Sequence, residues 1–186
     1  MLTASFITDF QHAFASGQTI AYPTEAVFGL GCDPDNDEAI ARILSIKTRP
    51  QDKGVILIAS QLAQLTRYVD ISALTTEQWD TVQATWPGPY TWIIPKRTEV
   101  SELLSGGRAT LAVRLSAHPV VRQLCDAVDK PMVSTSANPS GLEPARDIHK
   151  IAEYFADSVF VVDGPVDRTA QPSKIQDAVT GQVLRG

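Results

Sequence analysis

The sequence predicts an α/β fold, in which helices form an open, twisted sandwich around a largely buried, mixed β-sheet. The first reason is that segments with apolar residues at helical spacing alternate with short apolar segments bounded by glycine or proline. The second reason is size, because 186 residues, 44% of them hydrophobic, suffice for one well-buried core but not for two. We therefore expect a single domain over residues 1–186, without a repeat or a linker.

The chain is expected to open with a helix followed by a strand. Apolar side chains recur at helical spacing from Phe6 to Phe14 and stop at Gly17, which suits the end of a helix. The apolar segment from Thr19 to Tyr22 then predicts a short strand, which Pro23 ends.

A second helix and a second strand are expected next. Asn36 or Asp35 can cap a helix, and Pro50 forces the residue before it out of helical geometry. The apolar segment 55–59 predicts a buried strand. The apolar face of the helix is expected to consist of Ile40, Ile43 and Leu44.

The rest of the chain continues the alternation. Ser116 and Pro119 suit the cap and the first turn of a helix that runs to Asp129. The other expected elements are helices around 76–85 and 147–155 and strands at 90–94, 110–115, 132–135, 159–162 and 182–184.

The overall charge argues against a protein whose main task is to clamp nucleic acid. The net charge is -5 and the isoelectric point lies near 5.1, so any site for a polyanion must be local. The N-terminus lacks the pattern of a signal peptide, and no segment approaches the roughly 20 apolar residues of a membrane span. We therefore expect a cytoplasmic protein with no membrane partner.

Positive charge is concentrated in one part of the chain. Residues 39–69 contain five basic side chains and one acid, Asp52, which gives a local charge of +4. Lys47, Arg49 and Lys53 lie at the end of the expected helix and in the loop after it, where they can converge on a polyphosphate. The alternative is that they only complement the negative end of the helix dipole.

The segment 21–34 contains a possible ligand loop. Thr24, Glu25, Gly29 and Gly31 follow the first expected strand. The glycines do not fit GxGxxG, and GxxxxGK[ST] does not occur in the sequence, so phosphate would have to be held in another way. The alternative for the two glycines is tight reversal of the chain.

A second group of polar side chains ends the strand expected at 132–135. Ser134, Thr135, Ser136 and Asn138 present hydroxyl and amide groups at the carboxyl edge of a sheet, where α/β proteins bind small polar ligands. The alternative is a turn that Asn-Pro-Ser-Gly chemistry alone would produce.

Arg114 stands inside an apolar strand pattern and therefore needs an anionic partner. A substrate carboxylate would serve, and so would a structural aspartate. Ser173 and Arg185 add another hydroxyl and another cation near the C-terminus, each a weak signal alone.

Taken together and in this order, the motifs resemble those of the YrdC-like family, and most closely its short bacterial form. The resemblance covers nearly the whole chain. The motifs that carry it are Tyr22-Pro-Thr-Glu-Ala-Val-Phe-Gly-Leu-Gly, KxR at Lys47 and Arg49, Trp86-Pro-Gly-Pro, Leu111-Ala-Val-Arg, SxN at Ser136 and Asn138, and Pro172-Ser.

The resemblance implies a single YrdC-like domain that lacks the extra C-terminal domain of the long family form. It also implies an enzyme, a nucleotidyltransferase that makes L-threonylcarbamoyladenylate and pyrophosphate from L-threonine, bicarbonate and ATP. The product would serve the threonylcarbamoyladenosine modification at position 37 of tRNAs that read ANN codons. The implied cofactor is Mg²⁺ with ATP, without a metal site built from protein side chains. A separate tRNA threonylcarbamoyl transferase complex would act downstream, and contact with tRNA is possible.

The resemblance also implies roles for individual residues. Lys47 and Arg49 are the expected catalytic residues, acting by holding phosphates. Threonine is expected to bind to Thr24, Arg114, Ser136 and Ser173, and ATP to Lys47, Arg49, Lys53, Thr110, Asn138, Arg146 and Arg185.

Two other functions compete with the enzyme. A non-catalytic module could bind structured RNA, but the aromatic residues, 7% of the chain, are not interleaved with the basic cluster. A nucleotide-sensing domain would keep the cations but would have no need for the hydroxyl groups of an amino-acid site.

Overall fold

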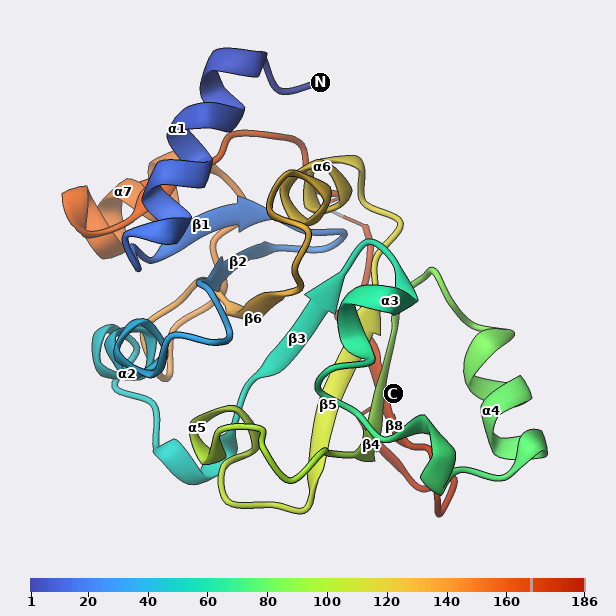
Figure 1. Cartoon of the computed structure of the whole chain (residues 1–186). Helices are drawn as coiled ribbons and strands as arrows, with labels where there is room; N and C mark the ends of the chain where they lie inside the picture. Colours follow the sequence, from blue (N-terminus) through green and yellow to red (C-terminus); the bar gives the residue numbers. More distant parts are fainter. Residues whose placement is uncertain (168, 186) are drawn as a thin grey trace.

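A twisted, mixed β-sheet runs through the protein, with helices against both of its faces (Figure 1). The computed structural model describes residues 1–167 and 169–185. Within these residues the sheet has nine strands in the order β7-β1-β2-β6-β3-β5-β4-β8-β9. The strands are β1 (Ile20–Pro23), β2 (Phe28–Gly31), β3 (Ile56–Ala59), β4 (Tyr90–Pro95), β5 (Thr110–Leu115), β6 (Met132–Ser136), β7 (Phe160–Val161), β8 (Lys174–Asp177) and β9 (Val183–Arg185).

The sheet combines both kinds of strand pairing, as expected. The pairs β1/β7, β3/β5 and β4/β8 are parallel, whereas the remaining neighbours are antiparallel. The helices are α1 (Ala4–Ala15), α2 (Asp37–Ile46), α3 (Leu62–Leu65), α4 (Thr76–Gln83), α5 (Glu102–Ser105), α6 (Pro119–Val128) and α7 (Ile148–Phe155), with 3₁₀ segments η1 (Gln51–Lys53), η2 (Ile71–Ala73) and η3 (Ala156–Ser158). None of the described helices is long and apolar enough to cross a membrane.

Side-chain caps fix where several helices begin. The Asn36 side chain accepts a hydrogen bond from the Ala39 N–H at the start of α2, so Asn36 is the cap of the two expected candidates, Asn36 and Asp35. The expected cap of α6 is wrong, because His118 and not Ser116 occupies the capping position, with Pro119 in the first turn. The Ser116 hydroxyl donates a hydrogen bond to Glu25 instead.

The two faces of the sheet are covered differently. Residues of β3 alternate, so that Leu57 and Ala59 join the core beneath α2, whereas Ile58 packs beneath α1 and α6. Figure 1 shows α1 and α6 close together over the β1 side of the sheet, and α6 contacts both β1 and β3. The part of this second face around Ile56 is left uncovered by α1 and α6, and it becomes the floor of a cleft.

The expected ligand loop at 21–34 is only partly a loop. A turn at residues 24–27 is followed by strand β2, which sequence analysis missed because two of its four residues are glycines. Gly31 is required in this strand, since a Cβ atom there would lie 2.1 Å from the carbonyl oxygen of Val133. The alternative interpretation, tight chain reversal at Gly29 and Gly31, is therefore wrong, because both glycines lie in an extended strand that packs closely against its neighbours.

Candidate active site

A cleft of about 520 Å³ lies on the sheet face that α1 and α6 leave open. Its floor is apolar and comes from four neighbouring strands. Its walls are polar and come from the turn at 24–27, the end of β6, the loop around η1 and the segment 171–173. The floor residues are Ile56 on β3, Ala112 on β5, Ile93 on β4 and Ile175 on β8.

Strand alternation brings Arg114 to this cleft. Leu111 and Val113 of β5 point into the core, so Thr110, Ala112 and Arg114 share the opposite face and line the cleft. Arg114 is only 8% exposed. Its Nε donates a hydrogen bond to the carbonyl oxygen of Gly88, 3.2 Å away, so the Trp86-Pro-Gly-Pro turn orients this side chain.

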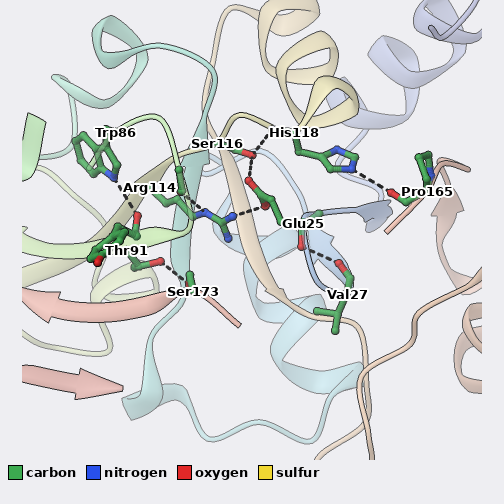
Figure 2. Close-up of polar contacts among 12 residues, drawn as sticks. Glu25, Val27, Trp86, Thr91, Arg114, Ser116, His118, Pro165 and Ser173 are labelled. Carbon is green, nitrogen blue, oxygen red and sulfur yellow. Dashed lines mark hydrogen bonds and ion pairs between the residues drawn. The ribbon is translucent and has the colours of Figure 1, made fainter. Parts of the chain in front are cut away.

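Glu25 is the anionic partner that Arg114 needs. One carboxylate oxygen of Glu25 forms an ion pair with Arg114, and the other accepts a hydrogen bond of 2.7 Å from the Ser116 hydroxyl (Figure 2). Thr24, in the same turn as Glu25, also lines the cleft. Its hydroxyl group donates a hydrogen bond of 2.7 Å to the carbonyl oxygen of Val27.

The Glu25 network continues behind the cleft. The backbone N–H of His118 donates to the Ser116 hydroxyl oxygen, and His118 Nε2 lies 3.0 Å from the carbonyl oxygen of Pro165 (Figure 2). Because a carbonyl can only accept, the Nε2 nitrogen carries a proton in this contact. The Asp167 N–H also donates to the Glu25 carbonyl oxygen at 2.8 Å, so the chain before β8 is tied to the site at two points.

Ser173 and Arg185 complete this side of the cleft. The Ser173 and Thr91 hydroxyl groups lie 2.8 Å apart, and Arg185 donates to the Ser173 carbonyl oxygen through Nε at 3.0 Å and a terminal nitrogen at 2.8 Å. Burial and the nearby charge of Arg114 lower the pKa of Arg185. Arg185 therefore adds a second positive charge beside Arg114, which is the guanidinium group that pairs with Glu25. We call Thr24, Arg114 and Ser173 the hydroxyl end of the cleft.

The other end of the cleft is lined by cations. Arg49 and Lys53 come from the loop around η1, and Arg108 comes from the turn before β5. Burial, followed by the charge of Arg108, lowers the pKa of Arg49. We call Arg49, Lys53 and Arg108 the cationic end. Ser134 and Ser136 on β6 also line the cleft.

Lys47 lies behind this wall instead of in it. Its side chain is buried, and its ammonium group donates hydrogen bonds to the carbonyl oxygens of Ser136 and Asn138, the latter at 2.7 Å. Burial and the charge of Arg49 lower the pKa of Lys47 to about 8. The three cations expected to converge are therefore not Lys47, Arg49 and Lys53, because Lys47 holds the end of β6 from behind and Arg108 takes the third place.

Two expected nucleotide ligands also lie outside the cleft lining. The Asn138 side-chain amide donates to the carbonyl oxygens of Pro139 and Leu142, at 3.0 and 2.7 Å, and so closes the turn after β6. Arg146 is exposed, two residues beyond the lining residue Pro144. Direct contact of Lys47, Asn138 or Arg146 with a nucleotide stays a prediction.

The remaining expected residues do come together around one cavity. They are Thr24, Arg49, Lys53, Thr110, Arg114, Ser136, Ser173 and Arg185.

Sequence analysis missed Arg108 and did not recognise the role of Glu25. Arg108 lies outside the basic cluster of residues 39–69, and only the fold brings it to Arg49. Glu25 was noted as part of a loop, but its pairing with Arg114 depends on strands that are distant in sequence.

The site offers no cage of protein ligands for a metal. Within residues 1–167 and 169–185, no group of three or more His, Cys, Asp or Glu side chains could hold an ion. A metal ion at the cationic end would have to be held mainly by oxygens of its ligand, as Mg²⁺ is by the phosphates of a nucleotide.

The arrangement can seat two anions side by side. The hydroxyl end offers a guanidinium group and alcohol side chains that suit a small polar carboxylate. The cationic end suits phosphate groups. None of these residues is an activated nucleophile, so the chemistry that fits is the positioning of two substrates and the stabilisation of charge.

Comparisons with known proteins agree with the fold. A family model for Sua5, YciO and YrdC, described as telomere recombination, matches residues 12–186. A threonylcarbamoyl-AMP synthase of Serratia proteamaculans is 49% identical over 183 residues, which is 98% of this chain and 97% of the relative.

Two solved structures of P. abyssi Sua5 are similar over most of this chain. A double variant aligns with a TM-score of 0.90 and 29% identity, over 98% of this chain and 56% of that one. A complex with L-threonine aligns with a TM-score of 0.87 and 30% identity, over 95% of this chain and 52% of that one. This chain thus spans about half the length of these two neighbours.

Proposed function

This chain belongs to the Sua5/YciO/YrdC family, and on that premise we propose that it is a threonylcarbamoyl-AMP synthase. The enzyme is a nucleotidyltransferase that converts L-threonine, bicarbonate and ATP to L-threonylcarbamoyladenylate and pyrophosphate. One observation carries the proposal: a single cleft joins a hydroxyl end built around Arg114 to a cationic end built around Arg49.

The reaction needs little chemistry from the protein itself. The amine of threonine adds to carbon dioxide with loss of a proton, or to bicarbonate with loss of water, and one oxygen of the resulting carbamate attacks the α-phosphorus of ATP. Attack and departure of pyrophosphate are in line, so the protein must hold two anions close together and neutralise the leaving group. The described lining residues include hydroxyl groups but neither a cysteine nor a histidine, which fits this demand.

The position of each side chain supports the role that we assign to it. Arg114 binds the threonine carboxylate, and the hydroxyl groups of Thr24 and Ser173 contact the polar groups of threonine. Ser136 contacts the substrates between the two ends, and Arg185 binds the nucleotide beside Ser173.

The phosphates of ATP lie at the cationic end. Arg49 and Lys53 contact them directly, with Thr110 beside them at the start of β5. Mg²⁺ enters with ATP and offsets part of the phosphate charge. Lys47 supports the site from behind, through the carbonyl oxygens of Ser136 and Asn138.

The proposal includes the fate of the product. A mixed anhydride of a carbamate and AMP is a labile group donor, so a second enzyme must consume it soon after release. By analogy with the family, this is a tRNA threonylcarbamoyl transferase complex that modifies adenosine 37, and both proteins are cytoplasmic.

A non-catalytic RNA-binding module is not favoured. Its phosphate contacts would have to form a basic surface, but the net charge is -5 and Lys47 is buried. A cleft that pairs a buried Arg114 with Glu25 is also unsuited to sequence-independent binding of a backbone.

The test is release of pyrophosphate from ATP by the purified protein. We expect release that requires both threonine and bicarbonate, together with a product whose mass increases by one unit when the bicarbonate carries ¹³C. Retention of tRNA without ATP turnover would instead support the binding module.

A further inference from the structure

The turn between α5 and β5 presents two groups to the cationic end that the expected site does not include. Arg108 and Ser105 both line the cleft, and both belong to the sequence Ser105-Gly106-Gly107-Arg108. The chain reaches the cleft here because α5 packs against η1, the segment that carries Lys53.

Two glycines allow this close approach. A Cβ atom on Gly106 would lie 2.5 Å from the carbonyl oxygen of Asp52 and 2.7 Å from the nitrogen of Gly54. A Cβ atom on Gly54 would lie 2.9 Å from the carbonyl oxygen of Leu104. Both residues also have positive φ, 65° and 57°, which favours glycine. The backbone of the turn that carries Arg108 therefore lies in direct contact with the backbone of the loop that carries Lys53.

The two guanidinium groups at this junction are each anchored on one edge. Arg108 donates to the carbonyl oxygens of Ser105, at 3.1 Å, and Asp52, at 2.6 Å. Arg49 donates to the carbonyl oxygen of Gly54 through Nε at 3.2 Å and a terminal nitrogen at 3.0 Å. A guanidinium group has five N–H donors, so each retains donors for a ligand after these anchors are made.

Ser105 adds a hydroxyl group whose hydrogen bonding is incomplete. The residue is 3% exposed, and its side-chain oxygen has no hydrogen-bond partner within the described part of the chain. A buried hydroxyl without a partner costs free energy unless a ligand completes it. Because Ser105 lines the cleft, a ligand at the cationic end can do so.

The balance of charge at the junction identifies the ligand as an anion. Arg49, Arg108 and Lys53 line the cleft here, whereas the two carboxylates near the junction belong to the exposed residues Asp52 and Glu102, which are not among the described lining residues. The charge of Arg108 is one of the causes that lower the pKa of Arg49. An anion with several oxygens between the two guanidinium groups would relieve this repulsion and use their free donors.

The position along β5 shows which part of the ATP molecule fits. Arg108 comes before β5 and Arg114 lies near its carboxyl end, so their Cα atoms are separated by up to six residues of extended chain, about 20 Å. If threonine binds at Arg114, an in-line reaction puts the leaving group on the far side of the α-phosphorus, toward Arg108.

We propose that Arg108 and Ser105 form a subsite for the β- and γ-phosphates of ATP and thus for the leaving pyrophosphate. This subsite rests on the proposed function. As the carbamate oxygen forms its bond to the α-phosphorus, the bond from that phosphorus to the bridging oxygen breaks, and the electron pair leaves with pyrophosphate. Arg108 stabilises the charge that gathers there and contributes to binding of pyrophosphate itself.

Binding measurements test the subsite without any need for turnover. The probes are inorganic pyrophosphate, ATP and AMP, each with Mg²⁺, titrated into the full chain by calorimetry. The variants are Arg108→Ala, Arg108→Gln and Ser105→Ala, with Arg122→Ala as the control, because Arg122 is an exposed residue of α6 away from the cleft.

We expect Arg108→Ala and Arg108→Gln to lower the affinity for pyrophosphate and for ATP at least tenfold. The affinity for AMP should fall less than twofold. Ser105→Ala should lower the affinity for pyrophosphate two- to fivefold, and Arg122→Ala should bind all three probes with the affinity of the wild type. The proposed subsite is refuted if the wild type does not bind pyrophosphate, or if both Arg108 variants bind it as tightly as the wild type does. It is also refuted if the Arg108 variants lose as much affinity for AMP as for pyrophosphate. Circular dichroism identifies a variant that fails to fold. If Arg108→Ala does not fold, the affinity of Arg108→Gln for pyrophosphate decides the test.

The same samples separate failure of the subsite from failure of the proposed function. Wild-type protein that forms threonylcarbamoyladenylate while Arg108 variants bind pyrophosphate normally would refute only the subsite. Wild-type protein that binds pyrophosphate through Arg108 but makes no adenylate would refute the proposed function and leave an anion subsite in place.

Discussion

Arg114 of β5 and Glu25 of the turn after β1 form an ion pair in the wall of the cleft. Their side chains are only 10% and 21% exposed, so water screens the pair poorly. The pair therefore has two functions: it satisfies charges that the fold has buried, and it fixes the guanidinium group that we assign to the threonine carboxylate.

The first prediction separates these two functions of the pair. Arg114→Met leaves the Glu25 carboxylate without its cation and should lower the free energy of unfolding by about 1–3 kcal/mol. The double variant Glu25→Gln/Arg114→Met should recover most of this loss, because it also removes the stranded charge. Neither protein should bind threonine. Denaturation curves and threonine titrations of both proteins check this, and a double variant that binds threonine would contradict the role of Arg114.

The second prediction compares two glycines of the same strand. Gly31→Ala should lower the free energy of unfolding by about 3 kcal/mol, because the new Cβ atom would collide with the Val133 carbonyl oxygen at 2.1 Å. Gly29→Ala is the matched control, since its nearest neighbour, Tyr22, would be 3.4 Å away. It should stay within about 1 kcal/mol of wild type. Equal effects in urea denaturation would show that β2 does not pack as described.

The third prediction concerns the strained residue inside the KxR motif. Thr48 has φ of 51° and lies just beyond α2, where its N–H bonds to the Ser45 carbonyl oxygen and the Arg49 N–H bonds to the Leu44 carbonyl oxygen. Glycine is the usual residue at this position of a helix end.

Thr48→Gly should therefore raise the free energy of unfolding by about 0.5–1 kcal/mol, because relief of left-handed strain exceeds the entropy that glycine adds to the unfolded chain. Ser45→Gly, inside α2, should have the opposite sign, a loss of about 0.5 kcal/mol. Thermal melts of both variants check these two predictions. A Thr48→Gly protein less stable than the wild type would show that the backbone at Thr48 is not strained.

The fourth prediction uses the lowered pKa of Lys47. The folded-state value is about 8, against 10.5 for the free side chain. Between these values the unfolded chain binds more protons than the folded protein, so this residue makes the free energy of unfolding increase with pH. Below pH 8 the cost of burying the charged ammonium group is fully present.

Relative to Lys47→Met, the free energy of unfolding of wild type should be constant below about pH 8. Above that pH it should increase by up to about 1.4 kcal/mol per unit, until near pH 10.5. The comparison cancels the other titrating groups, which both proteins share. Parallel profiles across this range would mean that Lys47 keeps an ordinary pKa and is not buried as described.

Local pattern was sufficient for the elements with clear periodicity. Strand β5 and the need of Arg114 for an anionic partner followed from the apolar strand pattern, and helix chemistry narrowed the cap of α2 to Asn36 or Asp35. Strand β2 was missed because glycine is a poor indicator of strands, although here Gly31 is needed for close packing. Helix α5 and strand β8 were missed because each has only four residues and no distinct period.

In the candidate site, too, local sequence pattern predicted only part of the arrangement. The cation-rich loop was visible in the sequence, but the burial of Lys47 and the arrival of Arg108 depend on contacts between distant segments. The two glycines that join α5 to η1 are ordinary in the sequence, and only the folded chain shows that a Cβ atom would not fit. The pairing of Glu25 with Arg114 likewise depends on contact between segments that are distant in sequence.

A crystal structure with L-threonine and α,β-methylene-ATP tests the central claim most directly, because this analogue cannot release pyrophosphate. We predict the threonine carboxylate on Arg114 and the triphosphate along Arg49, Lys53 and Arg108, with the α-phosphorus between the two ends of the cleft. A nucleotide bound on another face of the protein, or threonine bound away from Arg114, would contradict the account.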